Sequence, residues 1–459
     1  AGGEAEEWAV EINNAVMSVV PIGRNFRGED VYEGEDGRFV VTEKGERIRA
    51  SESNEVSAVF LYAFTPEDMA LCADAFVAEI SRGKNFLFAD LARFASLVTG
   101  TPEADIEQSD VLHDVQEAIE AAIVRAMRDS VNAADQTAFE VARRIDEGQP
   151  PLVARTSASV LLQQYSTPMP ISIAAQSILG DVAGKTVLEP TVGNGALLCT
   201  LKGARITACD LDETRLGNTA RNFRDAKVHQ ADATEVDFRA LNDGEGFDAV
   251  IANPPFGGLS KSRVIEGVKI ARIDHLILLR SLLARKPDGV GVFIVGADSY
   301  VDAKAGQVTG GSRYLFNWLA DHYEVDVVEE DGHLYAKQGA TFPIRIVVVG
   351  RAGKGGAQVP DKLPVIRSHE ELWMWAMQMR AKYGHGASEA LGHVVGALPA
   401  SNEGGDTDQQ SVPEREGNSF QSPYRAFSKV SEATTMVPRN LATPIMLALE
   451  DVVAEHGDI

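Results

Sequence analysis

Residues 187–195 read Val-Leu-Glu-Pro-Thr-Val-Gly-Asn-Gly, and this stretch decides the fold class of the chain. It describes a short apolar strand that ends in the carboxylate of Glu189 and runs into a turn with two glycines, Gly193 and Gly195. Such glycines let the backbone approach a ligand closely before a helix begins. The alternative interpretation is that they only make a tight turn.

Short apolar runs and helical stretches alternate from this point onward. The apolar runs cover 186–188, 205–208, 249–251, 290–295 and 344–349, and the helical stretches cover 212–222, 272–285 and 313–321. This alternation predicts an α/β fold with a doubly wound, mostly parallel sheet.

The spacing around the turn favours a nucleoside cofactor. Asp210 ends the next apolar run, at the position from which an acid accepts hydrogen bonds from ribose hydroxyls. A dinucleotide site requires a third glycine where Leu198 stands. Residues 180–186 resemble a P-loop only superficially, because their glycines are too close together and they precede a strand.

A second motif follows the apolar run 248–252: Asn253-Pro254-Pro255-Phe256. Two prolines at a strand end fix the backbone and leave carbonyl groups without local donors. An amide oxygen beside a rigid carbonyl offers two acceptors to one planar NH₂ group. Such acceptors favour the pyramidal nitrogen of a transition state in which an exocyclic amine is the nucleophile. The alternative is a plain loop after a strand.

Taken in order, these motifs resemble those of a known enzyme family. Residues 163–352 resemble an S-adenosylmethionine-dependent adenine-N6 DNA methyltransferase, which implies a Rossmann-like class I methyltransferase fold. The resemblance implies a catalytic tetrapeptide at Asn253, Pro254, Pro255 and Phe256. It also implies cofactor contacts at Tyr165, Thr167, Pro168, Glu189, Gly193, Gly195, Asp210, Asp232 and Asn253.

The resemblance also implies residues that hold the substrate. Tyr335, in a segment similar to the late hairpin of the family, is expected to stack on an extruded base opposite Phe256; both rings could instead belong to the core. Lys261 and Arg263 belong to the stretch 257–280, which holds five basic and two acidic side chains and is the candidate for phosphate contact.

Several segments are similar to the methylase part of phage and plasmid methylase-helicase fusions of the strawberry-notch type, including defence-against-restriction proteins. They are Gln164 to Pro168, Glu189 to Thr191, Leu334 to Gly339, and Thr435 to Leu441. This implies a phage or mobile-element setting and a helicase region or other phage proteins as partners. The sequence shows no large target-recognition domain, so we expect low sequence specificity on DNA. The alternatives are methylation of an RNA base or a protein glutamine, and a phage structural or protective protein.

Charge is distributed unevenly along the chain. The net charge is −24, and residues 1–150 hold 30 acidic and 13 basic side chains. Apolar residues at helical spacing in 4–20 and 54–147 predict an acidic helical domain over 1–150, with a hairpin near residues 39–41. The methyltransferase domain is expected over 151–352, a helical extension over 353–398, a linker over 399–423 and a tail with an amphipathic helix over 424–459. Because the acidic region repels phosphates, we expect its deletion to improve DNA binding.

Composition and residue spacing also indicate the expected localisation and whether a metal site is expected. No apolar run is long enough to span a membrane, and the acidic N-terminus is unlike a signal peptide. We therefore expect a protein of the host cytoplasm, or one packaged in a virion. The three cysteines and the histidines lack metal-ligand spacing, so we expect no metal.

Overall fold

A computed structural model describes residues 8–12, 15–24, 30–34, 39–41, 66–99, 106, 110–154, 166–297, 305–338, 342–353 and 359–386. Tyr165, the expected linker over 399–423 and the expected tail helix over 424–459 lie outside these residues.

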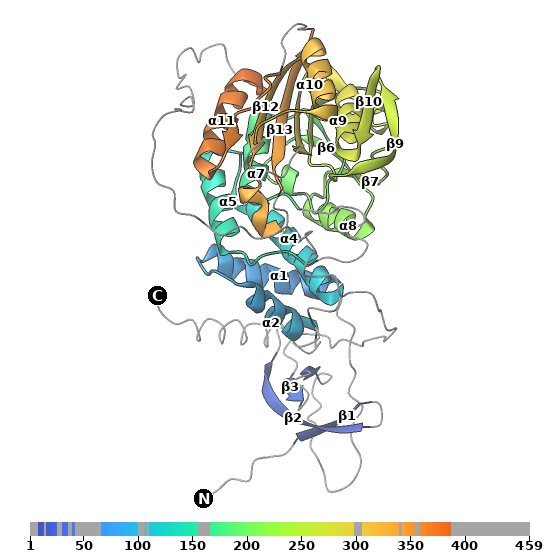
Figure 1. The fold of residues 1–459 in the computed structure, drawn as a ribbon. Helices are drawn as coiled ribbons and strands as arrows, with labels where there is room; N and C mark the ends of the chain where they lie inside the picture. The colour runs from blue at the N-terminus through green and yellow to red at the C-terminus, as the bar shows by residue number, and fades with distance from the viewer. Residues whose placement is uncertain are drawn as a thin grey trace, which may run out of the picture. The chain divides into compact units, whose positions relative to one another are not determined.

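An eight-stranded sheet forms the centre of the fold (Figure 1). Its spatial order is β14-β12-β13-β11-β8-β5-β6-β7, and β13 pairs antiparallel with both of its neighbours while the other pairs are parallel. The strands are β5 (Thr186–Glu189), β6 (Arg205–Asp210), β7 (Lys227–Gln230), β8 (Phe247–Ala252), β11 (Arg285–Gly296), β12 (Tyr323–Glu330), β13 (Ile344–Ala352) and β14 (Val365–Ile366). The predicted mostly parallel sheet is confirmed.

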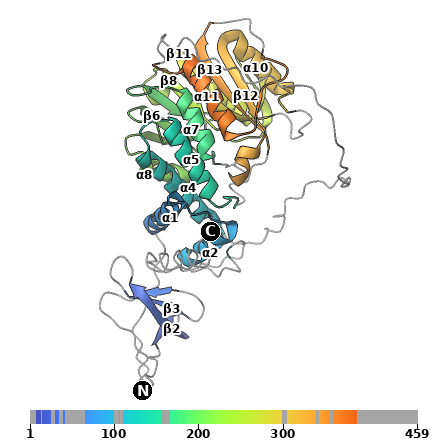
Figure 2. The ribbon, with the colours of Figure 1, turned by 90° about the vertical axis from the view of Figure 1, so that its left-hand side faces the viewer.

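Helices cover both faces of this sheet (Figure 2). Alternate strand residues supply two separate cores: Val187, Ala249 and Ile251 belong to one, while Leu188 and Val250 belong to the other. The first face carries α7 (Met169–Ile178), α8 (Glu213–Asn222) and α11 (His369–Tyr383), and the second carries α9 (Ile273–Leu283) and α10 (Gly310–His322). The sheet is therefore doubly wound, as predicted, and α11 lies in the expected helical extension.

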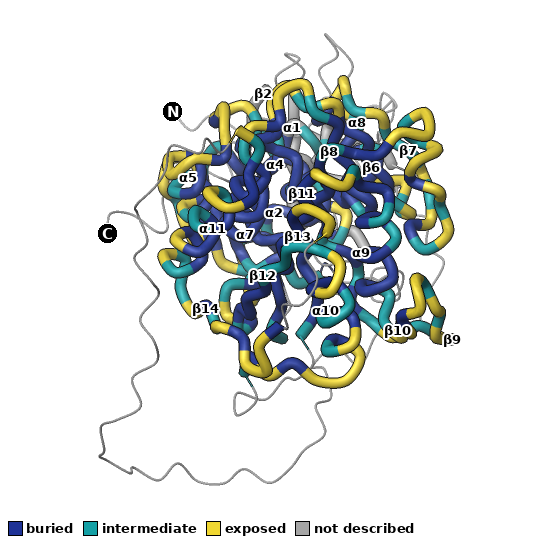
Figure 3. The backbone as a smooth tube through the Cα atoms, turned by 90° about the horizontal axis from the view of Figure 1, so that it is seen from above, coloured by how far each residue is buried: buried dark blue, intermediate teal, exposed yellow. Residues whose placement is uncertain are grey.

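Four further helices from the acidic region pack onto the first face. They are α1 (Pro66–Ser81), α2 (Phe88–Thr99), α4 (Asp110–Ser130) and α5 (Gln136–Gly148). Their buried residues join those of α7 in one continuous core, and Figure 3 shows α4 and α7 mostly buried. The helices predicted within 54–147 are confirmed, and they share a core with the sheet.

The expectation of a helix over residues 4–20 is wrong. Residues 8–12 and 15–24 form the strands β1 (Trp8–Ile12) and β2 (Ala15–Arg24) of a small antiparallel sheet with β3 (Asp30–Gly34) and β4 (Phe39–Val41). The apolar residues Trp8, Val10 and Ile12 alternate with Ala9 and Glu11, which is the period of a strand. The hairpin predicted near residues 39–41 is confirmed by the pairing of β3 with β4.

A short hairpin and three 3₁₀ turns complete the described elements. β9 (Gly258–Ile265) and β10 (Val268–Arg272) form the hairpin directly after the Asn-Pro-Pro-Phe segment. The 3₁₀ turns are η1 (Ala196–Leu198), η2 (Ala240–Asn242) and η4 (His333–Gln338). The strand order changes direction between β5 and β8, so their carboxyl ends mark the crevice where doubly wound sheets bind ligands.

Candidate active site

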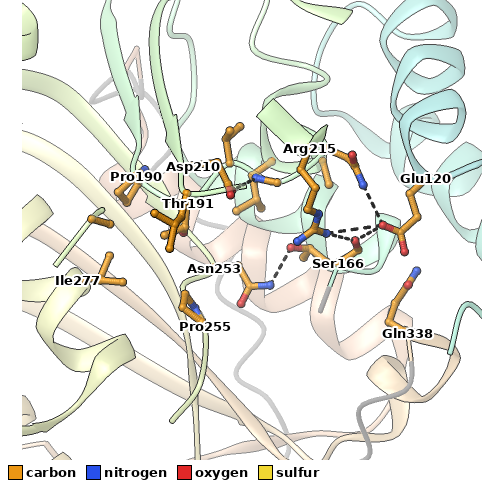
Figure 4. A pocket seen from close by; sticks show the side chains of 18 of the residues that line it. Glu120, Ser166, Pro190, Thr191, Asp210, Arg215, Asn253, Pro255, Ile277 and Gln338 are labelled. Carbon is orange, nitrogen blue, oxygen red and sulfur yellow. Dashed lines mark hydrogen bonds and ion pairs between the residues drawn. The ribbon is translucent and has the colours of Figure 1, made fainter. Parts of the chain in front are cut away.

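A cavity of about 250 Å³ opens at the carboxyl ends of β5, β6 and β8 (Figure 4). Its wall includes Asn253 and Pro255 of the tetrapeptide, together with residues 190–194 of the glycine turn. The helical region contributes Glu120, Ile123, Val124 and Gln149 to the same wall. The cavity is thus shared between the sheet and the earlier helices α4 and α5.

The glycine turn has the close packing that its sequence predicts. Gly193 and Gly195 have φ values of 52° and 88°, in the left-handed region that favours glycine. A Cβ atom on Gly195 would lie 2.6 Å from the Phe223 ring, and one on Gly193 would lie 3.3 Å from Cζ of Arg215. Neither position has room for a side chain without displacing its neighbours.

Asp210 and Asp232 both line the cavity, as expected for cofactor ligands. Asp210 also organises the turn, because its carboxylate accepts hydrogen bonds from the backbone N–H groups of Gly193 (2.7 Å) and Asp212 (2.9 Å). Burial raises the pKa of Asp210, while the charge of Arg215 lowers it. Asp232 is exposed at the rim and accepts from the backbone and hydroxyl of Thr234.

Glu189 lies beneath the cavity wall. Its side chain is fully buried, and one carboxylate oxygen accepts from the backbone (3.3 Å) and hydroxyl (3.4 Å) of Thr191. The other oxygen is buried without a hydrogen-bond partner among the described residues. Burial, followed by the nearby charge of Asp210, raises the pKa of Glu189 well above its ordinary value.

Asn253 lies in the middle of the cavity wall (Figure 4). Its amide nitrogen donates to the hydroxyl oxygens of Thr167 (2.9 Å) and Tyr335 (2.5 Å). Its amide oxygen is buried and accepts no hydrogen bond from the described residues. Thr167 also lines the cavity, and Pro168 directly precedes α7 as its N-cap. The structure therefore brings the predicted segments at 166–168 and 253–256 together.

The predicted base stack between Tyr335 and Phe256 needs correction for this conformation. Tyr335 is 0% exposed and Phe256 is 8% exposed, and neither lines the cavity. Phe256 packs edge-to-face on Phe342, with ring centroids 5.5 Å apart. Tyr335 belongs to the 3₁₀ turn η4 where we expected a hairpin, and its hydroxyl contacts Asn253. Both rings are thus part of the core, because the β12–η4 connection turns Tyr335 inward.

The basic side chains expected to contact phosphate differ in their exposure and in their protein partners. Lys261 is exposed on β9, whereas Arg263 forms an ion pair with Glu235 and donates to the carbonyl of Thr234 (3.1 Å). Arg272 and Arg280 of the same stretch bind Asp274 and the carbonyl of Val236. Three of the five cations therefore already have protein partners, which leaves a weaker phosphate surface than the sequence suggests.

An ion network at the cavity wall is not indicated by the sequence. Arg215 of α8 donates to Glu117 of α4 (3.0 Å) and to the Ser166 hydroxyl (2.6 Å), and lies 3.7 Å from Glu120. Asn194 of the glycine turn donates to both glutamates, at 2.7 and 3.0 Å. Burial alone would lower the pKa of Arg215, but the two glutamates raise it above its ordinary value. Nothing in the spacing of Glu117 and Glu120 indicates their partner, which lies about 100 residues away.

Glu330, the last residue of β12, supports the turn that carries Tyr335. It is fully buried, and its carboxylate accepts from the backbone N–H of Leu334 at 2.9 Å. Burial raises the pKa of Glu330 from 4.5 to about 7, although backbone hydrogen bonds from Leu334 and Gly332 lower it. The folded protein therefore binds this proton more tightly than the unfolded chain does.

We predict a pH dependence of stability from this residue. The protonated carboxyl of Glu330 contributes to the free energy of unfolding in full below pH 4.5, and this contribution is lost as the pH rises through about 7. The loss amounts to about 3 kcal/mol of unfolding free energy, and Glu330→Gln is expected to remove it. Urea unfolding of both proteins across this pH range measures the difference. Burial also raises the pKa of Asp146 to about 6, but Asp146 is present in both proteins, so its effect cancels in the difference. Parallel stability curves would contradict the assignment.

Within the described ranges, no helix is both long and apolar enough to cross a membrane. In the same ranges, no group of three or more His, Cys, Asp or Glu side chains is placed to hold a metal ion.

Comparisons with known proteins give similarities of limited extent. No protein-family model matches the chain. A stretch of 131 residues is 26% identical to the tRNA (guanine(10)-N2)-dimethyltransferase of Methanothermobacter thermautotrophicus, over 28% of this chain. The match spans only 38% of that relative's length.

Two solved structures resemble the fold at low identity. One is a modification subunit of a putative type I restriction enzyme from Vibrio vulnificus, with a TM-score of 0.36, 14% identity, and coverage of 59% of this chain and 61% of that one. The other is a putative class I S-adenosylmethionine-dependent methyltransferase from Listeria monocytogenes, with a TM-score of 0.35, 12% identity, and coverage of 68% and 98%. The mixed α/β fold with its large, mostly parallel sheet matches the expected Rossmann-like arrangement. The name of the Listeria structure includes S-adenosylmethionine, the cofactor that the sequence predicts.

Proposed function

We propose that this protein transfers a methyl group from S-adenosylmethionine to the N6 amine of adenine in DNA, with low sequence specificity. The observation that supports this proposal is the amide of Asn253, whose buried oxygen faces no donor of the described residues at the wall of the cavity. A buried acceptor of this kind is costly unless a ligand supplies the missing donor. An exocyclic NH₂ group is such a donor.

The chemistry of the amine that receives the methyl group explains why hydrogen-bond acceptors are useful at this position. The lone pair of an exocyclic amine is delocalised into the base, so the nitrogen is a weak nucleophile until it becomes pyramidal. The Asn253 oxygen and a backbone carbonyl of the Pro254-Pro255 segment would accept its two hydrogens and stabilise that geometry. Bound S-adenosylmethionine supplies an electrophilic methyl group. The nitrogen then gives up one proton to solvent as the new N–C bond replaces the C–S bond.

The side chains of the cavity wall suit the chemical groups of this cofactor. Asp210 and Asp232 can accept hydrogen bonds from ribose and adenine. Arg215, Glu120 and Ser166 line the same wall and present both signs of charge to the zwitterionic amino-acid end (Figure 4). The buried, unpartnered oxygen of Glu189 is a further acceptor beneath the turn. The residues present therefore fit the group.

Gly193→Leu is expected to abolish S-adenosylmethionine binding. The new side chain would start 3.3 Å from Arg215 and fill the space beside the turn. Gly184→Leu is a matched control, because Gly184 also has a positive φ, of 73°, but a Cβ atom added there would meet nothing within 4 Å. Titration calorimetry should show binding for the native protein and for Gly184→Leu. Equal binding by Gly193→Leu would contradict the placement of the cofactor.

A second candidate is methylation of an exocyclic amine in RNA. The curated relative named above is a tRNA guanine-N2 dimethyltransferase, and the Asn253 site suits either amine. Incubation with cofactor carrying a labelled methyl group, and with duplex DNA, single-stranded DNA, transfer RNA or a glutamine-containing protein, separates these acceptors. We expect label in DNA. Label confined to RNA or to the protein would favour the corresponding alternative and overturn the DNA assignment.

The setting of the reaction follows from the resemblance of the sequence. We propose that the protein modifies phage or mobile-element DNA against restriction, together with a helicase region or other phage proteins. Lys261 and Lys269, exposed on the β9–β10 hairpin, are the cations available for phosphate contact beside the cavity.

A further inference from the structure

Three segments far apart in the sequence meet at one amide group. Asn253 follows β8, Thr167 precedes α7, and Tyr335 lies in the turn η4. The two hydroxyl oxygens take both hydrogens of the Asn253 amide, at 2.9 and 2.5 Å. The Tyr335 ring is 0% exposed and stands behind Asn253, outside the cavity wall.

We infer that Tyr335 and Thr167 are positioning residues that hold the Asn253 amide with its oxygen toward the acceptor amine. This inference rests on the proposed function, because it assigns the free oxygen to an NH₂ group of the substrate. It gives Tyr335 a role through its hydroxyl and not through stacking on a base.

The opposite orientation of the amide shows why positioning matters. A rotation of 180° about the last side-chain bond exchanges the oxygen and the nitrogen, which are similar in size. The NH₂ group of Asn253 would then meet the NH₂ group of the acceptor, and two donors cannot pair. Both hydroxyl oxygens accept from the amide nitrogen, and the two hydroxyls also hydrogen-bond each other, which uses one of their two protons. At most one of them could therefore donate to an amide oxygen turned toward them, so the observed orientation keeps one more hydrogen bond than the reversed one.

The full-length protein with Tyr335→Phe tests this inference. Phenylalanine keeps the buried ring and removes only the hydroxyl. We expect single-turnover methyl transfer to fall about 3- to 10-fold, with the Kd for S-adenosylmethionine unchanged. Thr167→Val is expected to give a similar loss of rate, and Thr167→Ser, which restores the hydroxyl, is expected to recover it. Tyr383→Phe is the matched control, because Tyr383 is also buried but its hydroxyl binds Asp326 at 2.5 Å, away from the cavity.

A double-mutant cycle distinguishes positioning from general support of the fold. In the Asn253→Ala background, Tyr335→Phe should cause no further loss, because Tyr335 acts through the Asn253 amide. The same fold-loss in both backgrounds, or a native rate in both Tyr335→Phe and Thr167→Val, would overturn the inference. Were Tyr335→Phe to fail to fold, Thr167→Val and Thr167→Ser would decide by the same criteria. Absence of transfer to every acceptor by the native protein would instead contradict the proposed function itself.

Discussion

Replacing Arg215 with methionine is expected to lower the free energy of unfolding by about 3–5 kcal/mol. The side chains of Arg215, Glu117 and Glu120 are all less than 10% exposed, so removing the cation leaves two buried carboxylates without their counter-charge. Breaking a buried ion pair from one side costs far more than the pair contributes as a whole, because the remaining charges stay desolvated.

Urea unfolding of the native and variant proteins measures this effect. Glu117→Gln with Glu120→Gln in the Arg215→Met background should recover much of the loss, since the charges that need Arg215 are then absent. Arg82→Met is the control, because Arg82 binds Glu79 in an exposed pair, whose loss costs about 1 kcal/mol or less. A loss for Arg215→Met no larger than that of the control would show that the network does not stabilise the fold.

Replacing Asn253 with alanine is expected to slow methyl transfer by about 10²–10³-fold. The substitution removes the acceptor oxygen at the cavity wall and leaves Asp210, Asp232 and Arg215 in place. Binding of S-adenosylmethionine should therefore stay within a few-fold of native. Single-turnover assays with excess enzyme isolate the transfer step from product release.

Asn242→Ala is the control for Asn253→Ala. The Asn242 side chain donates only to backbone carbonyls of its own turn, at Glu245 and Gly246, so its loss should leave transfer unchanged. Transfer by Asn253→Ala within a few-fold of native would mean that the amide supports structure only.

The sheet and its turn could be predicted because they depend on local patterns. Strand β5, the left-handed glycines Gly193 and Gly195, and the acid Asp210 are all specified by residues close together in sequence. The strands at 8–24 resemble a helix in sequence, because a few apolar residues satisfy both the helical and the alternating spacing.

The parts that could not be predicted depend on contacts across the chain. From sequence alone, Arg215 resembles a surface residue near the start of α8. In the fold, α4 places Glu117 and Glu120 in contact with it. Likewise, the position of Tyr335 behind Asn253 depends on how the chain turns after β12, which local spacing does not specify.

The structure also changes the expectation for the acidic region. Sequence alone suggests that deleting residues 1–150 improves DNA binding. Glu120, Ile123, Val124 and Gln149 line the cavity, so the deletion would open the cavity as well as remove charge. The effect of charge on DNA binding can be separated from the effect on the cavity by neutralising exposed acids of this region, such as Asp129 and Glu147, with the helices left in place.

We propose that the chain methylates the N6 amine of adenine in DNA through Asn253. The decisive measurement is mass spectrometry of nucleosides, prepared from unmethylated DNA after incubation with the native protein and isotopically labelled S-adenosylmethionine. We expect labelled N6-methyldeoxyadenosine with the native protein and a loss of about 10²–10³-fold with Asn253→Ala. Label on another DNA base, or no label in DNA while the protein binds the cofactor, would contradict it.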